Sequence, residues 1–234
     1  MNLEGQLTLQ NISCPRAMMR FRLIYQGPLS GSGNSSKKTK QVQEIRDQLH
    51  PQLEYLWESH SSLKRLRRAA IVKQGGSPYY AVRDTPFVTE RDIVNYPARD
   101  DEIDLCGSII ENDRSYIPLV RTSLDLNCYL NILFLRHEDP GALVLQGGDL
   151  DNRIKTLFDA LRKPDAEIAA KYPQQYNPLY CLMESDTLIS GFDVDTDRLL
   201  VPPSNGRKND ACLVIEVVVG VLRIGSWNMC LLGM

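Results

Sequence analysis

The sequence predicts an α+β fold in which a small mixed β-sheet packs against two main helices. The helices are expected near 38–57 and 151–163, where apolar residues recur at intervals of three and four. The strands are expected where apolar and polar residues alternate or β-branched residues dominate. These predicted strands are 18–25, 126–136, 188–196 and 211–221, and the last should be central in the sheet.

Composition is that of an ordinary globular protein, with 234 residues, 43% hydrophobic and 24% charged. We therefore expect a single domain over 1–234. The net charge of −2 provides no general attraction for nucleic acid, so any DNA-binding surface must be a local basic patch. The longest apolar stretch, 213–222, is too short to span a bilayer, and no signal peptide is visible at the N-terminus. A soluble protein without membrane contact is expected.

The six cysteines are scattered along the chain, with no C-x-x-C pair and no histidine close by in sequence. This pattern argues against a zinc site and against a disulfide framework. Cys128, Cys181 and Cys212 lie among apolar residues and are expected in the core. Such cysteine usage is typical of the reducing cytoplasm, where we expect the protein to reside.

The first helix follows a loop rich in glycine and serine at 27–36. Pro51 lies within its apolar stripe, so the helix should kink or divide near His50. A second helical stretch is predicted over 61–72. The segment 75–113 is poorly periodic and is interpreted as an irregular insertion, a lid or a surface for a protein partner. The apolar tail 223–234 offers a second surface for a partner.

The most informative stretch is 147–162. Two glycines precede Asp149 and Asp151, which open the cleanest helical pattern in the chain. Two carboxylates so close in sequence repel unless a proton or cation lies between them, and Mg²⁺ is the natural cation for oxygen ligands. Lys155, one turn after Asp151, would steady negative charge on a phosphate. The alternative is a capped surface helix with an Asp151–Lys155 ion pair, which the spacing alone favours.

Asp149-Leu150-Asp151-Asn152, followed by Lys155 and Phe158-Asp159-Ala160-Leu161, resembles the central motif of the RusA-like Holliday junction resolvases. The resemblance covers roughly 126–219 and includes a second acidic motif at 183–189. It implies that Asp149, Asp151 and Asp186 bind the catalytic metal, Mg²⁺ with Mn²⁺ as a substitute, and that Lys155 is catalytic. Asn152 and Glu184 would support the site.

Three features depart from the family pattern, and one of them is the long inserted segment 75–113. Compact resolvases carry a basic run before the first aspartate, whereas Gln146-Gly147-Gly148 stands here. Ser185 replaces one acid of the downstream pair, beside Glu184. These departures bear on junction specificity more than on the metal chemistry.

A basic cluster follows the first helix. Its residues are Lys64, Arg65, Arg67, Arg68 and Lys73. Contact with a phosphate backbone and a solvated helix face are both consistent with this cluster.

The resemblance implies a magnesium-dependent endonuclease that acts on branched or structured DNA. The resemblance further implies a homodimer, the commonest symmetric assembly. The alternative function is a non-catalytic nucleic-acid-binding or assembly subunit that retains the resolvase fold.

Overall fold

The computed structural model describes residues 19–29, 35–67, 69–74, 77–82, 102–137, 149–166, 169, 175–200, 210–224 and 228–232. At Ser35, Asp149, Met229 and Leu232, and in 69–74, 77–82 and 102–103, the description covers the backbone alone. The two glycines before Asp149 and the apolar run 142–145 lie outside the described residues, as does Arg68.

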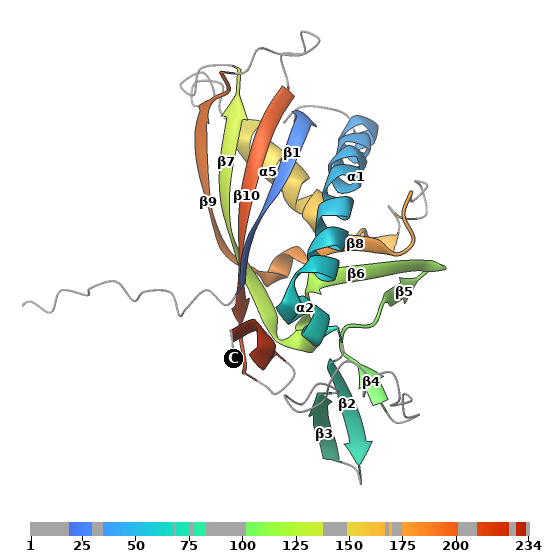
Figure 1. The fold of residues 1–234 in the computed structure, drawn as a ribbon. Helices are drawn as coiled ribbons and strands as arrows, with labels where there is room; N and C mark the ends of the chain where they lie inside the picture. Colours follow the sequence, from blue (N-terminus) through green and yellow to red (C-terminus); the bar gives the residue numbers. More distant parts are fainter. Residues whose placement is uncertain are drawn as a thin grey trace, which may run out of the picture.

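The main sheet contains four strands in the order β1-β10-β7-β9 (Figure 1). These strands are β1 (Met19–Pro28), β7 (Leu126–Arg136), β9 (Ile189–Arg198) and β10 (Asp210–Val221). β10 pairs antiparallel with both of its neighbours, whereas β7 and β9 pair in parallel. The four predicted strands are therefore present, and the strand predicted to be central lies between β1 and β7.

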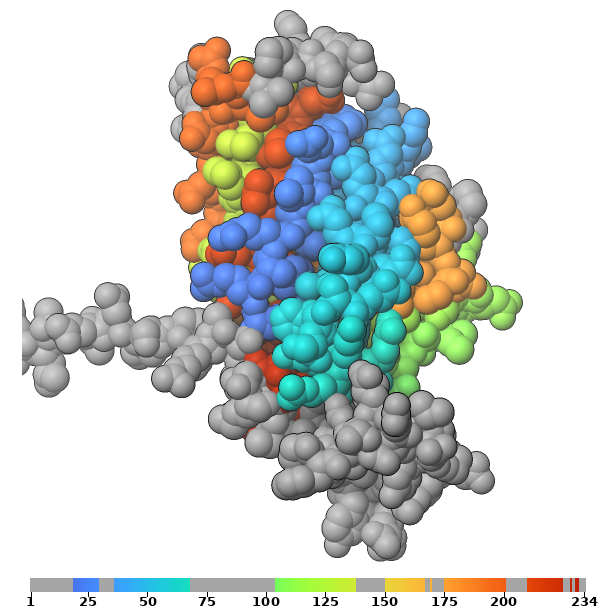
Figure 2. Space-filling model, in the orientation of Figure 1, coloured from blue at the N-terminus to red at the C-terminus, as the bar shows by residue number. Residues whose placement is uncertain are grey.

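Two helices cover one face of this sheet. They are α1 (Ser35–Ser59) and α5 (Asp149–Leu161), which also contact each other. Figure 2 shows α1 running along the surface beside β1. We expected α1 to kink or divide near His50, and the structure excludes division, because one helix runs through Pro51. Pro51 is exposed, so the carbonyl that loses its hydrogen bond to the missing N–H can face water.

Alternation along the strands separates a buried face from an outer one. Leu23, Ile215, Val217 and Leu130 are almost fully buried beneath the helices. The intervening residues of each strand point to the opposite side, as the twofold period of a strand requires. The helices therefore meet only one face of the sheet, and the core lies between α1, α5 and that face.

A second sheet of three strands, in the order β5-β6-β8, adjoins the helices (Figure 1). It contains β5 (Ile109–Glu111), β6 (Arg114–Val120) and β8 (Leu179–Met183), with β6 and β8 parallel. Short 3-10 turns follow these strands: η1 (Thr122–Leu124) after β6 and η2 (Asp186–Leu188) after β8. A last one, η4 (Met229–Leu232), contacts α2, so part of the predicted apolar tail docks on the body.

The segment between α1 and β6 differs most from expectation. The second helix, α2 (Ser61–Leu66), is shorter than predicted, because 69–74 form strand β2 (Ala69–Gln74). β2 pairs with β3 (Ser77–Val82) and β4 (Glu102–Asp104). β-branched Ile71 and Val72 favour this extended pairing over a helix. The predicted irregular insertion thus contains strands as well as segments outside the described residues.

The α+β prediction is confirmed. Cys128, Cys181 and Cys212 are buried free thiols, as expected. Among the described residues, no helix combines the length and apolar character needed to cross a membrane.

Candidate functional site

The first turn of α5 carries a closely paired carboxylate and ammonium. The Lys155 Nζ lies 2.7 Å from Asp151 Oδ2, and the two side chains are 63% and 68% exposed. A separation of four residues places them one above the other on the helix surface. The ion pair expected for the alternative, a capped surface helix, is therefore present, in a position open to solvent.

The same turn is electrostatically suited to anions and anionic side chains. Asp149 is the first residue of α5, and the free backbone N–H groups of a helix start favour negative charge. Asn152 is exposed, and its backbone carbonyl accepts a hydrogen bond from the Thr156 hydroxyl at 2.8 Å. The side chain of Asp149 lies outside the described residues, so its distance to Asp151 is not defined.

Packing fixes which flank of α5 faces outward. Leu157 and Leu161 are buried against the sheet, and Ile154 is 5% exposed. The Phe158 ring meets the Phe192 ring of β9 edge-on, with 5.1 Å between centroids. Because these contacts hold the apolar stripe inward, Asp151 must project on the solvent side.

The opposite end of α5 is held by a buried arginine from α1. Arg46 is 4% exposed and donates to the backbone carbonyls of Asp159 and Arg162. These carbonyls belong to the last turn and the residue after it, where a helix leaves acceptors unpaired. Burial lowers the pKa of Arg46 to about 10, yet its guanidinium stays charged at neutral pH.

A second arginine extends this network at the surface. Arg162 makes a two-pronged contact with Asp165, at 2.5 Å and 2.7 Å, and also reaches Asp159. The hydrogen bond from Arg162 lowers the pKa of Asp165, since it favours the charged carboxylate. Lys38 of α1 pairs with Asp159 at 3.0 Å. Ionic contacts thus connect α1 to the C-terminal end of α5.

The second acidic motif lies beside that C-terminal end. Met183 pairs with Arg162, and its carbonyl accepts from the Lys163 N–H at 2.9 Å. Asp186 follows three residues later, in η2, which contacts α5. Figure 1 shows η2 near the lower end of α5, whereas α5 begins near the top of the sheet. A helix of 13 residues is about 20 Å long, so Asp151 and Asp186 belong to different ends of it.

The remaining residues of this motif have local partners. Glu184 accepts hydrogen bonds from the Thr122 backbone N–H and hydroxyl, at 3.1 Å and 2.7 Å. The Ser185 hydroxyl caps η2 by accepting from the Thr187 N–H. Asp186 itself is exposed. The structure therefore brings Asp151 and Lys155 together, but it does not bring Asp186 to them.

The donor set for magnesium is incomplete among the described side chains. They contain no group of three or more histidine, cysteine, aspartate or glutamate residues that could hold a metal. The Asp149 side chain lies outside the described residues, and its backbone begins α5, two residues before Asp151. Two carboxylates at a helix start fit Mg²⁺, which keeps several waters and takes one or two protein carboxylates.

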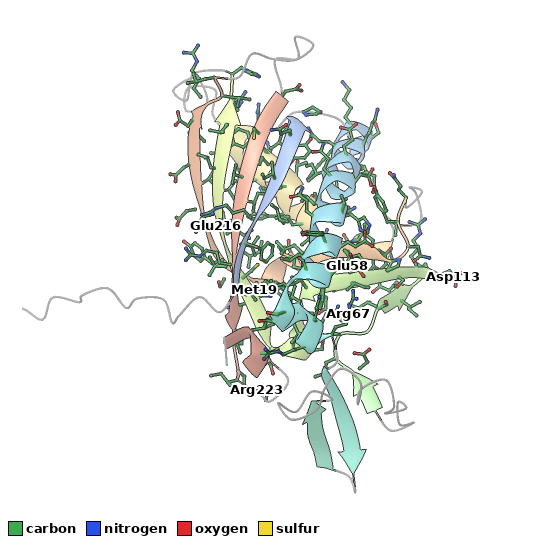
Figure 3. All side chains as sticks on the ribbon, viewed as in Figure 1. Met19, Glu58, Arg67, Asp113, Glu216 and Arg223 are labelled. Carbon is green, nitrogen blue, oxygen red and sulfur yellow. The ribbon has the colours of Figure 1, made fainter. Side chains whose placement is uncertain are left out.

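The described side chains of the predicted basic cluster are all exposed. Lys64 and Arg65 lie on α2, and Arg67 follows it. Arg67 (labelled in Figure 3) also donates to the Tyr180 hydroxyl at 2.7 Å and lies over the Trp57 ring. The side chains of Arg68 and Lys73 lie outside the described residues. In Figure 1 α2 lies below the lower end of α1, whereas α5 begins near the top of the main sheet.

Four arginines of the described residues are buried, and none was identified as buried from the sequence; they are Arg46, Arg121, Arg136 and Arg153. Arg121 donates to the carbonyls of Pro118, Leu105 and Gly107. These hydrogen bonds hold the segment before β5 against the end of β6. Arg46 falls within the apolar stripe of α1, between Ile45 and Leu49. A charge within such a stripe is the signal that could have identified Arg46, because buried charges need dedicated partners.

Comparison of the chain with protein-family models, with curated proteins and with solved structures found no match.

Proposed function

We propose that this protein is a magnesium-dependent endonuclease acting on branched or structured DNA, as the resemblance to RusA-like resolvases suggests. The observation that carries the proposal is the exposed Asp151–Lys155 pair in the first turn of α5. A carboxylate and an ammonium at an open helix start provide both a cation ligand and a phosphate contact.

Each residue has a separate task in this proposal. Asp149 and Asp151 would hold Mg²⁺, which when bound neutralises phosphate charge and lowers the pKa of its water. Lys155 would exchange its contact with Asp151 for a non-bridging phosphate oxygen, balancing the charge that grows during attack. Asparagine in place of Asp149 or Asp151, or glutamine in place of Lys155, would keep the approximate size of the side chain and remove its charge.

Cleavage of labelled four-way junctions, flaps and duplexes with and without Mg²⁺ tests the activity. Asp151→Asn should lower cleavage at least about a hundredfold, because a lost metal ligand removes several kcal/mol of charge stabilisation. Glu44→Gln is the matched control, since Glu44 forms a similar exposed pair with Lys40 on α1. Equal cleavage by wild type and Asp151→Asn would contradict the proposed site.

Metal binding can be measured separately from cleavage. Calorimetry with Mn²⁺ or Mg²⁺ should show weaker binding by Asp149→Asn and Asp151→Asn. Asp186→Asn addresses the third ligand that the resemblance implies: unchanged metal affinity would assign the site to the two aspartates of α5 alone.

The separation of Asp186 from Asp151 supports a second candidate, a non-catalytic nucleic-acid-binding or assembly subunit. In that case wild type binds junctions without cutting them, and Asp151→Asn binds equally well. Absence of cleavage with every substrate and both metals, together with retained DNA binding, would favour this function.

The basic residues of α2 provide the binding test common to both candidates. Lys64→Ala with Arg65→Ala should weaken DNA binding and flatten its salt dependence by about one unit of slope per lost phosphate contact. Lys40→Ala on α1 is a matched control for loss of positive charge. An unchanged slope would mean that these two side chains do not contact the phosphate backbone.

A further inference from the structure

The two edges of the main sheet differ in how their backbone groups are used. β1 forms one edge, and two glutamines of α1 lie along it. Gln52 accepts from the Ile24 N–H at 2.9 Å and donates to the Ile24 carbonyl at 2.7 Å. Gln48 makes the same pair of contacts with Gln26, at 3.2 Å and 3.0 Å. Because a glutamine amide offers both a donor and an acceptor, α1 covers this edge much as a further strand would.

The other edge, β9, has no comparable cover in the part of the chain that the structure describes. β7 is the one described strand that pairs with it, over residues 189–198 (Figure 1). Pairing on one side uses one row of N–H and C=O groups and leaves the row on the other side for another chain. A free edge of this length suits β-augmentation, in which an extended segment is added to a sheet as a strand. We call it the β9 edge.

The side of the β9 edge away from the helices is acidic. Asp193, Asp195 and Asp197 alternate along β9 and are all exposed. Residues at alternate positions of a strand lie about 7 Å apart, so the three carboxylates form a line of negative charge. The Tyr129 hydroxyl donates to Asp193 at 2.8 Å, which leaves that charge in place. Cationic side chains beside this line would offset the repulsion between its members.

The side of the β9 edge that faces the helices is apolar. Phe192 and Val194 lie on it, because their neighbours in β7, Leu130 and Ile132, are buried in the core. Phe192 is nevertheless 46% exposed, although its ring meets Phe158 of α5. The apolar surface therefore reaches the β9 edge without being fully covered there. One more strand with apolar side chains on this side would remove Phe192 from water.

We propose that the β9 edge binds an extended basic segment of another protein, in which lysine or arginine alternates with apolar residues. Side chains of a strand point alternately to its two faces. In the added strand the basic side chains lie beside the line of aspartates, and the apolar ones lie beside Phe192 and Val194. Backbone hydrogen bonds provide affinity, and the two faces select the sequence pattern.

Other occupants fit the β9 edge less well. A second copy of β9, paired antiparallel around a two-fold axis, brings three more aspartates onto the same face, and like charges on neighbouring strands destabilise pairing. Nucleic acid is repelled by the same carboxylates. Charged side chains are also a usual protection of free edges against self-association. At the β9 edge this protection and the preference for a basic partner have the same cause.

Peptide binding tests the proposal on the full chain, without DNA or metal, and so independently of the proposed nuclease activity. The probe is a fluorescent peptide of about eight residues, a common strand length, with alternating lysine and valine. Fluorescence anisotropy should show saturable binding that weakens as salt is added, because exposed charges are screened. The same peptide with glutamate in place of lysine should bind at least about tenfold more weakly. Absence of saturable binding by the lysine peptide would overturn the proposal.

A charge reversal on β9 tests the acidic line. Asp195→Lys should weaken binding of the lysine peptide at least about tenfold and strengthen binding of the glutamate peptide, a gain that also shows the variant to be folded. Asp195→Asn removes the charge with little change of size and should weaken lysine-peptide binding several-fold. Glu58→Lys reverses an exposed charge on α1, away from β9 (Figure 3), and should change neither affinity by more than about twofold. Equal binding by wild type and both Asp195 variants would contradict the proposal.

Blocked backbone donors separate strand addition from simple charge attraction. Two further peptides carry N-methyl groups, one on its lysines and the other on its valines. In an added strand the N–H groups of alternate residues face β9, so at least one of these peptides should bind at least about tenfold more weakly. Equal binding by the unmodified and both methylated peptides would rule out strand addition. A fall in the mass of the wild type toward 26.5 kDa on adding the lysine peptide, measured by light scattering, would instead assign the β9 edge to a second copy.

Discussion

The two ends of α5 use charged side chains in opposite ways. At the C-terminal end, buried Arg46 reaches two backbone carbonyls, and Arg162 forms a two-pronged contact with Asp165. At the N-terminal end, Asp151 and Lys155 pair with each other and stand mostly in solvent. The first set of charges holds the helix in place, whereas the second remains accessible to a ligand.

This difference indicates how a fold can fix a helix at one end and leave the charged side chains of its other end accessible. An exposed ion pair contributes little to stability, so exchanging it for a ligand costs little. A site of this kind still needs a fixed position, because small displacements of reacting groups reduce rates strongly. The buried end of α5 supplies that position, and the exposed end supplies the chemistry.

The largest expected effect is at the buried end. Arg46→Leu keeps much of the side-chain volume but leaves the carbonyls of Asp159 and Arg162 without their donor. We expect the free energy of unfolding to fall by about 2–4 kcal/mol, measured by urea denaturation. Lys40→Leu, on the exposed side of the same helix, should change it by less than about 0.5 kcal/mol. Equal effects of the two changes would contradict the role assigned to Arg46.

A smaller effect is expected at the surface part of that network. Asp165→Asn should lower the free energy of unfolding at neutral pH by about 1 kcal/mol or less, because the Arg162–Asp165 contact is partly solvated. The pKa of Asp165 is lowered in the folded protein, below its ordinary value of 3.8. The stabilisation is therefore fully present above the unfolded pKa and is lost as pH falls through the folded pKa.

Urea denaturation of wild type and Asp165→Asn at a series of pH values checks the sign. The difference between the two proteins should be constant from neutral pH down to about pH 5 and should shrink below about pH 4. A difference that grows on acidification would show that Asp165 is not stabilised as the charged form.

The smallest effect on stability is expected at the exposed end. Lys155→Met removes the i,i+4 pair with Asp151, and such pairs contribute about 0.3–0.5 kcal/mol. We expect a change of that size in urea denaturation, together with a fall in cleavage if the proposed function holds. A loss of several kcal/mol would mean that this end of α5 is structural, like the other, and would remove the contrast between them.

Much of the fold could be predicted because its signals are local. The alternation in 126–136 and the apolar stripe of 151–163 each predict an element with one buried face. In the structure, β7 and α5 bury these faces in the same core. The Asp151–Lys155 contact was likewise predictable, since four residues on a helix are always one turn apart.

The failures involve competition between distant segments. Taken alone, the sequence 69–74 is compatible with a continued helix. In the structure it forms a strand, because it pairs with β3 and β4. Pro51 destabilises the helix locally, because it removes a backbone hydrogen bond. The buried residues before and after Pro51 pack in the core, and α1 stays one continuous helix. The spatial relation of Asp186 to Asp151 depends on how β8 joins the end of α5, which no local pattern encodes.

The position of β10 also has a consequence for biosynthesis. This strand lies in the middle of the main sheet, yet it pairs residues near 215 with residues near 23. During synthesis, β1 and β7 leave the ribosome long before β10, the strand that pairs with both of them. Until β10 is made, the apolar faces of β1 and β7 lack their central neighbour. Contacts so distant in sequence make folding slow and expose intermediates to aggregation. A chain stopped before residue 210 would lose both antiparallel pairings at once.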